Sequence, residues 1–126
     1  MNNPHVMLVD DNAMNIELVS FVLGNEGFEV ETAINADAAL ARIAVAPPEL
    51  ILMDIQLPGM DGLELTRRLK ADPKTRSIVI VAFTAYAMKG DEVKMRAAGC
   101  DAYLSKPIDV ATFGATVRAM LAAGAH

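Results

Sequence analysis

The sequence predicts an α/β fold: a doubly wound, five-stranded parallel sheet with helices on both faces. Strand-like and helix-like segments alternate five times along the 126 residues, a pattern typical of βαβ units. The third strand-like run, residues 50–54, is the most apolar, as expected of a central strand buried on both faces. The crossovers of such a sheet are right-handed, and ligands bind beyond the carboxyl ends of its strands.

Short apolar or alternating runs predict the strands, while capping and stop residues predict the helices. The strands are expected at residues 5–9, 28–32, 50–54, 78–83 and 102–104. Asn12 and Asn35 suit helix N-caps, and Gly27 suits a helix stop. We expect the first helix to have a buried face that includes Phe21. The helices are expected at residues 14–25, 36–44, 63–70, 89–98 and 110–122.

Composition excludes several classes of protein. The net charge of −5 and the pI near 4.9 argue against a nucleic-acid binder, which would carry a basic face. Cys100 is the only cysteine, which fits a reducing cytoplasm. The sequence shows neither a signal-peptide pattern nor an apolar run near the roughly 18 residues that a membrane helix needs. We therefore expect a cytoplasmic protein that binds neither nucleic acid nor membrane.

Charged and polar residues follow four of the five predicted strands. Asp10 and Asp11 end the first strand, and Asp54 ends the third. Thr84 follows the fourth strand, and Lys106 follows the fifth. Because the carboxyl ends of parallel strands share one edge of the sheet, we expect three acids, a hydroxyl and an ammonium to meet there.

Three clustered carboxylates require a cation. Two of them about 4 Å apart repel by roughly 4 kcal/mol at an effective dielectric constant near 20. Oxygen ligands without histidine or cysteine favour Mg²⁺ or Ca²⁺ over zinc, and Mg²⁺ combines few carboxylates with a phosphate. Lys106 and Thr84 suit that phosphate, because an ammonium and a hydroxyl bind phosphoryl oxygens. A carboxylate between the metal and the lysine is then a candidate nucleophile for phosphoryl transfer.

Four sequence blocks resemble the signature blocks of the response-regulator receiver family. Each block alone is weakly specific, but together they stand in the family's order and spacing and cover essentially the whole chain. The blocks are Leu8-Val-Asp-Asp-Asn12, Leu52-Met-Asp-Ile-Gln-Leu-Pro-Gly-Met-Asp-Gly62, Phe83-Thr-Ala85 and Tyr103-Leu-Ser-Lys-Pro107. The resemblance implies the flavodoxin-like (βα)₅ receiver fold with strand order 2-1-3-4-5.

The resemblance also implies the phosphoacceptor and the metal ligands. Asp54 is the expected phosphoacceptor and one of the groups around Mg²⁺. Asp11 is the expected direct Mg²⁺ ligand, and Asp10 is expected to assist directly or through water. The backbone carbonyl of Gln56 is expected to complete the protein ligands.

The remaining matched residues are implied to form a switch. Thr84 resembles the family's switch hydroxyl, Lys106 its lysine counter-charge and Tyr103 its rotating aromatic residue. The Lys106–Pro107 bond is expected to be cis, which only a following proline makes accessible. Tyr86 is expected to slow hydrolysis of the aspartyl phosphate by limiting the access of water.

The resemblance implies a phosphoacceptor domain in two-component phosphorelay signalling. A sensor histidine kinase or a histidine phosphotransfer protein is the expected donor. A downstream protein target is expected to sense the face formed by the fourth helix, fifth strand and fifth helix. The chain is not expected to be an enzyme, although it would catalyse its own phosphorylation and a slow hydrolysis of the aspartyl phosphate. Residues 84–92 and 99–103 most resemble single-domain regulators of the DivK type.

The length of 126 residues fits one domain. We therefore expect residues 1–126 to form one receiver domain without an output domain, as a monomer or weak dimer.

Other functions compete with this interpretation. A receiver excised from a hybrid histidine kinase and a phosphate-independent interaction module both stay open. A Mg²⁺-dependent aspartyl phosphatase is disfavoured, because Gln56 stands where that class has a second acid and cannot act as a general acid. A dinucleotide-binding module is also disfavoured, because the first βα turn lacks G-x-G-x-x-G.

Overall fold

Strands and helices alternate throughout the computed structural model, which describes residues 4–57, 59–84, 89–106 and 108–124. The strands are β1 (His5–Val9), β2 (Glu29–Ala33), β3 (Leu50–Met53), β4 (Val79–Thr84) and β5 (Ala102–Ser105). The helices are α1 (Ala13–Asn25), α2 (Ala36–Val45), α3 (Gly62–Ala71), α4 (Lys89–Ala98) and α5 (Phe113–Gly124). Within these ranges no helix has both the length and the apolar composition that crossing a membrane requires.

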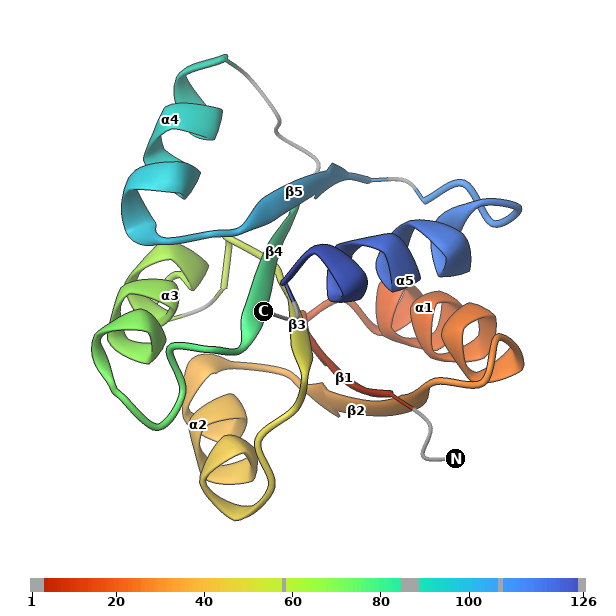
Figure 1. The fold of residues 1–126 in the computed structure, drawn as a ribbon, viewed down its shortest axis with the longest axis horizontal. Helices are drawn as coiled ribbons and strands as arrows, with labels where there is room; N and C mark the ends of the chain where they lie inside the picture. The colour runs from red at the N-terminus through yellow and green to blue at the C-terminus, as the bar shows by residue number, and fades with distance from the viewer. Residues whose placement is uncertain (1–3, 58, 85–88, 107, 125–126) are drawn as a thin grey trace.

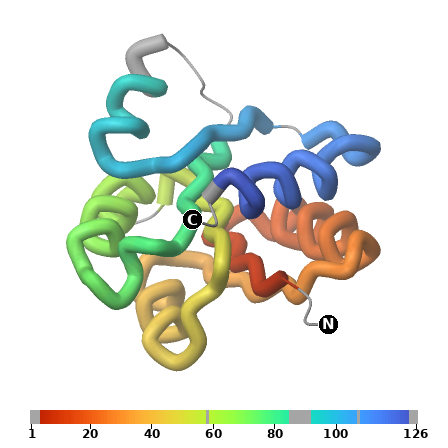
Figure 2. Tube along the Cα trace, viewed as in Figure 1, coloured from red at the N-terminus to blue at the C-terminus, as the bar shows by residue number. Residues whose placement is uncertain are grey.

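The five strands form one parallel sheet in the order β2-β1-β3-β4-β5, which confirms the predicted topology. At its centre, Leu52 of β3 pairs with Leu8 of β1 on one side and with Val81 of β4 on the other. Helices α1 and α5 cover one face of the sheet, and α2, α3 and α4 cover the other (Figure 1). The Cα trace in Figure 2 follows α1 and α5 as they lie next to each other on their shared face.

Each face of the sheet has its own apolar core. Met7 and Val9 of β1 belong to the core beneath α2 and α3, whereas Val6 and Leu8 belong to the core beneath α1 and α5. Every residue of β3 is buried, because a central parallel strand is covered on both sides. A slip of one residue would exchange the two sets of side chains, so the two cores together fix the strand register.

Side-chain caps set several of the helix boundaries. Asn12, Asn35 and Asp61 each accept a hydrogen bond from the backbone N–H three residues further on, at 2.8–3.1 Å, and one such cap contributes about 1 kcal/mol. Helix α5 begins at Phe113 rather than at residue 110. The Asp109 side chain accepts from the N–H two residues on, and its carbonyl accepts from Phe113, so a turn precedes the helix.

One prediction about α1 is wrong. Phe21 is 68% exposed, although the sequence pattern placed it on the buried face. Val19 is buried, and Phe21 lies about 200° around the helix from it, so both cannot face the sheet. Met14 and Leu18 are exposed as well, and their spacing places them beside Phe21. We call Met14, Leu18 and Phe21 the α1 stripe.

Candidate functional site

Three acids meet at the carboxyl edge of the sheet. Asp10 and Asp11 directly follow β1, and Asp54 directly follows β3, the adjacent strand. One carboxylate oxygen from each lies within 4.8 Å of the others. Asp10 is fully buried and Asp54 is 6% exposed, whereas Asp11 is exposed to solvent. We call these three residues the acidic cluster.

The backbone orients the two buried carboxylates in the same way. Oδ1 of Asp10 accepts from the N–H of Asn12, and Oδ1 of Asp54 accepts from the N–H of Gln56, both at 2.9 Å. In each case the donor lies two residues further on, as in an Asx turn. The Oδ2 atom of each carboxylate is therefore directed toward a shared partner, the ammonium of Lys106.

Lys106 reaches the acidic cluster from the end of β5. Its Nζ lies 2.8 Å from Oδ2 of Asp10 and 3.4 Å from Oδ2 of Asp54. Its backbone N–H donates to the carbonyl of Thr84 at 2.9 Å, which fixes where the side chain begins. Only 14% of the side chain is exposed, so the ion pairs are poorly screened by solvent. The ammonium is therefore shared, and in this state it lies closer to Asp10.

Asp54 has a perturbed pKa. Burial raises the pKa of this carboxyl above its ordinary value, and the negative charge of Asp10 raises it further. The N–H of Gln56 and the ammonium of Lys106 act in the opposite direction and lower it, but desolvation prevails. The ionised form of Asp54 is thus disfavoured by its surroundings, and additional positive charge beside it would stabilise the carboxylate.

The other predicted site residues lie around this centre. Thr84 ends β4 and is buried, with 1% of its surface exposed. Gln56 is exposed, and its N–H is the group seen to contact Asp54. Tyr103 lies on β5 opposite Ala82 and is 37% exposed, so it is not a core residue in this state. The predictions for Tyr86 and for the Lys106–Pro107 bond concern residues outside the described ranges.

A comparison of the sequence with protein families decides the classification. Residues 6–118 match the response regulator receiver domain family. The chain belongs to this family. It is a receiver domain of a two-component response regulator and is DivK-like: it is 46% identical over 116 residues to the polar-differentiation response regulator DivK of Brucella anthropi, with 92% of this chain and 94% of that protein covered.

Solved receiver structures agree with the fold of this receiver domain. A response regulator from Chloroflexus aurantiacus superimposes with a TM-score of 0.90 at 30% identity, covering 96% of this chain and 99% of that one. The receiver domain of a sensor histidine kinase from Pseudomonas aeruginosa superimposes with a TM-score of 0.86 at 29% identity, covering 95% and 98%. The latter structure has a magnesium ion coordinated in its active site cleft.

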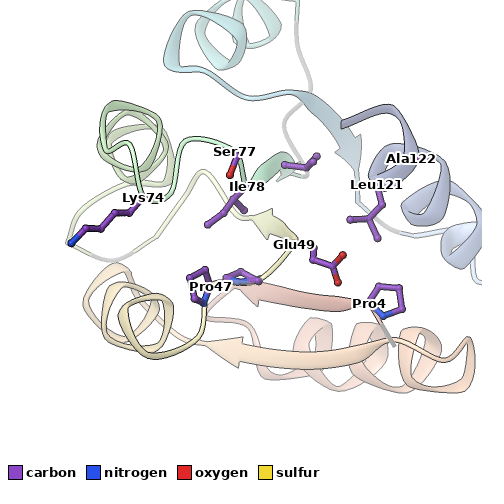
Figure 3. Close-up of a pocket in the computed structure, with 10 residues that line it drawn as sticks. Pro4, Pro47, Glu49, Lys74, Ser77, Ile78, Leu121 and Ala122 are labelled. Atoms are coloured by element: carbon purple, nitrogen blue, oxygen red, sulfur yellow. The ribbon is translucent and has the colours of Figure 1, made fainter. Parts of the chain in front are cut away.

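The donor set of this receiver domain fits a hard divalent cation. The acidic cluster offers three carboxylates and neither histidine nor cysteine, which suits Mg²⁺ better than zinc. Elsewhere in the described chain no other group of three ligating side chains comes together. A pocket of about 500 Å³ lies at the opposite edge of the sheet (Figure 3). Proline and aliphatic side chains line much of that pocket, and none of the three acids of the cluster belongs to its lining.

Sequence reasoning missed two residues of this receiver site. The Phe83 ring lies beneath the Lys106 ammonium, with Nζ 5.1 Å from the ring centroid. Gly62, the first residue of α3, lies directly behind Asp54: a Cβ at this position would be 2.2 Å from the Asp54 carbonyl oxygen. A glycine directly after the Asp61 cap is a weak sequence signal for such close approach. Nothing local in the sequence indicates the contact between Lys106 and Phe83, because it depends on how β4 and β5 pair.

Proposed function

We propose that Asp54 accepts a phosphoryl group from a phosphohistidine donor in the presence of Mg²⁺, and that a protein partner senses the resulting change. The observation that carries this proposal is the meeting of the acidic cluster with Lys106, which offers a buried carboxylate between a cation site and an ammonium. The roles of Asp10, Asp11 and the Gln56 carbonyl as metal ligands are part of the proposal. A bound Mg²⁺ would neutralise the cluster and the charge that develops on the phosphoryl oxygens.

The transfer is an in-line displacement. A carboxylate oxygen of Asp54 attacks the phosphorus and forms a P–O bond while the P–N bond to the donor imidazole breaks. The electron pair stays on the imidazole, which takes up a proton and leaves neutral. The protein contributes position and charge in such a reaction. Lys106 already lies 3.4 Å from Oδ2 of Asp54, so its ammonium can follow the new phosphoryl oxygens.

Phosphorylation then redistributes the contacts at this edge. The new group carries about −1.5 to −2 charges and three acceptor oxygens. Lys106 is drawn away from Asp10 toward these oxygens, and the Thr84 hydroxyl at the end of β4 turns to donate to them. Tyr103, on the neighbouring strand, occupies the space that is released. Such a switch from 1:99 to 99:1 requires that the phosphoryl group favour the active state by about 5.5 kcal/mol.

The decisive experiment compares two aspartates of the same loop. Asp54→Asn should abolish labelling by acetyl phosphate and Mg²⁺, as read by intact-protein mass. Asp61→Asn is the matched control, because Asp61 caps α3 and asparagine caps a helix equally well. The control should label at the wild-type rate. Undiminished labelling of Asp54→Asn would refute the assignment of Asp54 as the phosphoacceptor. Loss of labelling in Asp61→Asn alone would assign that role to Asp61.

Turnover distinguishes the proposal from its rivals. We propose that hydrolysis of the aspartyl phosphate is slow, so the protein acts as a switch in the cytoplasm rather than as a phosphatase. Steady turnover of p-nitrophenyl phosphate would instead support the phosphatase. If no phosphoryl donor labels Asp54, the result would support a phosphate-independent interaction module.

We further propose that the donor protein, a histidine kinase or histidine phosphotransfer protein, covers the α1 stripe. A donor must bring its phosphohistidine to Asp54, and α1 begins two residues after Asp11. Met14 and Phe21 are 79% and 68% exposed, and an exposed apolar stripe on the helix that begins next to the site suits a protein contact. Phe21→Asp should slow transfer from a phosphorylated histidine phosphotransfer protein by about tenfold, the effect of losing one apolar anchor.

The control for this docking surface lies on another helix. Val45 on α2 is 87% exposed, so Val45→Asp introduces the same charge away from the stripe. Transfer to this variant should stay at the wild-type rate. Both variants should label normally with acetyl phosphate, because this small donor needs no docking surface. Equal transfer to wild type and Phe21→Asp would place the donor elsewhere.

A further inference from the structure

The Phe83 ring is a part of the site that the phosphoryl-transfer chemistry described above does not use. Phe83 is the penultimate residue of β4, and its side chain belongs to the core beneath α1 and α5. The ring is 1% exposed. The ammonium of Lys106 lies over it, 5.1 Å from the centroid. A cation in this position is attracted by the electron-rich face of the ring, more strongly where water is excluded.

From this geometry we infer that Phe83 is a positioning residue for Lys106, an inference that rests on the proposed phosphoryl transfer. The lysine side chain has four flexible carbons and would otherwise sample many positions. Two carboxylate oxygens lie 2.8 and 3.4 Å from the ammonium nitrogen, and the ring centroid lies 5.1 Å from it. The ammonium is thereby held where it can serve either Asp10 or Asp54.

An aromatic face suits a group that must change partners. A carboxylate or carbonyl in its place would bind the ammonium by a directional hydrogen bond and hold it there. The attraction of a ring face is broad and has no preferred donor direction. Lys106 can therefore move from Asp10 toward a phosphoryl group on Asp54 while it stays in contact with the ring.

The Phe83 ring packs near a second buried phenylalanine, Phe113. Its centroid lies 6.0 Å from that of Phe113, with an angle of 33° between the planes. Phe113 is the first residue of α5 and is 4% exposed. Phe113 supplies a matched control, since it is a buried phenylalanine of the same core.

The test replaces each ring by leucine. Phe83→Leu should lower the rate of labelling by acetyl phosphate and Mg²⁺ by about threefold to tenfold, the range expected for losing a poorly solvated cation–π contact. Phe113→Leu should label within about twofold of wild type. Circular dichroism and thermal unfolding of both variants confirm that they are folded. A wild-type rate for Phe83→Leu, or equal losses in both variants, would overturn the inference.

A double-mutant cycle shows whether Phe83 acts through Lys106. In a Lys106→Met background the residual labelling rate should not change when Phe83→Leu is added. A further loss of the size seen in the single variant would show that Phe83 acts by another route and would overturn the inference. If wild type itself is not labelled, the proposed function fails rather than this inference.

NMR spectroscopy of the wild-type protein tests the contact without phosphorylation and does not depend on whether a variant folds. Methylene protons of Lys106 next to the ring should be shifted upfield in the NMR spectrum of the wild-type protein. Phe83→Leu should remove the shift and Phe113→Leu should keep it. Lys106 methylene protons at ordinary chemical shifts in wild type would overturn the inference on their own.

Discussion

Two partly buried lysines of this receiver domain each pair with a carboxylate at 2.8 Å, but they differ in what surrounds them. Lys70 on α3 donates to Asp101 and also to the backbone carbonyls of Ile78 and Arg76, at 2.8 and 3.1 Å. Three donors thus have three acceptors, and two of those acceptors belong to the fixed backbone. Lys106 divides its ammonium between two carboxylates and an aromatic ring. The first environment locks a side chain, whereas the second allows it to change partners.

The comparison shows that burial and an ion pair do not distinguish a lysine with fixed partners from one that is proposed to act in phosphoryl transfer. Asp101 also accepts from the N–H of Ile80 at 2.8 Å, so the Lys70 pair ties α3 to the start of β4 and to the loop before β5. The acidic cluster, in contrast, keeps more negative than positive charge and holds Asp54 with a raised pKa. The distinguishing feature is whether the positive charge of the lysine balances the negative charge around it.

The largest expected effect is on phosphorylation when Lys106 is replaced. Lys106→Met keeps the length of the side chain but removes the charge that meets the phosphoryl oxygens. The labelling rate with acetyl phosphate and Mg²⁺ should fall by about 10²–10³-fold, the usual effect of removing a preorganised electrostatic group. Lys70→Met should label within about twofold of wild type. A Lys106→Met rate within fivefold of wild type would erase the contrast between the two lysines.

The next effect is on stability when Lys70 is replaced. Lys70→Met leaves two backbone carbonyls and Asp101 without their charged donor. The free energy of unfolding should fall by about 2 kcal/mol, since the partners are partly exposed and solvent replaces some of the loss. Urea unfolding at pH 7 measures it. An unchanged midpoint would mean that Lys70 is not the structural member of the comparison.

A smaller effect on stability is expected at Gly99, which lies against the Lys70 side chain. Gly99 has φ +108°, and a Cβ there would lie 2.8 Å from Cγ of Lys70. Gly99→Ala should therefore destabilise the fold by about 1–2 kcal/mol, through the left-handed backbone and the displaced lysine. Gly24→Ala is the control, because its Cβ would meet nothing within 4 Å. Inside α1 this change should stabilise by about 0.5–1 kcal/mol, and the two thermal midpoints should move in opposite directions.

The smallest effect concerns the charge of Asp54. Its raised pKa means that the folded protein holds this proton more tightly than the unfolded chain does. Stability is therefore lost as pH rises through the raised pKa. Asp54→Asn should be more stable than wild type by about 1 kcal/mol at pH 7 without Mg²⁺. The advantage should vanish at low pH, where the wild-type carboxyl is protonated, and it should shrink when Mg²⁺ is added.

Most of the fold could be predicted, because it depends on local patterns. The alternation of apolar strands and capped helices gives the parallel sheet, and the strand boundaries differ from the observed ones by at most one residue. The predicted start of α5 is three residues too early. The Asp109 side chain forms a turn before the helix, and hydrophobic periodicity does not reveal such a turn. The position of Phe21 was wrong because a helix rich in apolar residues offers more than one possible buried face.

The candidate site was predictable in composition but not in its contacts. Strand ends place Asp10, Asp54 and Lys106 at one edge of the sheet whatever their side chains do. The preference of Lys106 for Asp10 and its contact with Phe83 depend on the strand register and on side-chain packing between residues distant in sequence. A sequence pattern therefore predicts which residues form such a site. The three-dimensional structure shows which of their side chains contact one another.

The absence of a side chain at Gly62 lets α3 pack directly against the backbone of Asp54, the proposed phosphoacceptor. A Cβ at this position would lie only 2.2 Å from the Asp54 carbonyl oxygen, so α3 opposes movement of the Asp54 backbone toward the helix. We therefore expect the bulk of the proposed phosphoryl group on Asp54 to be accommodated on the other side, where β4 ends at Thr84 and Lys106 follows β5. A glycine that takes no part in the proposed chemistry would thereby direct the response to phosphorylation away from α3.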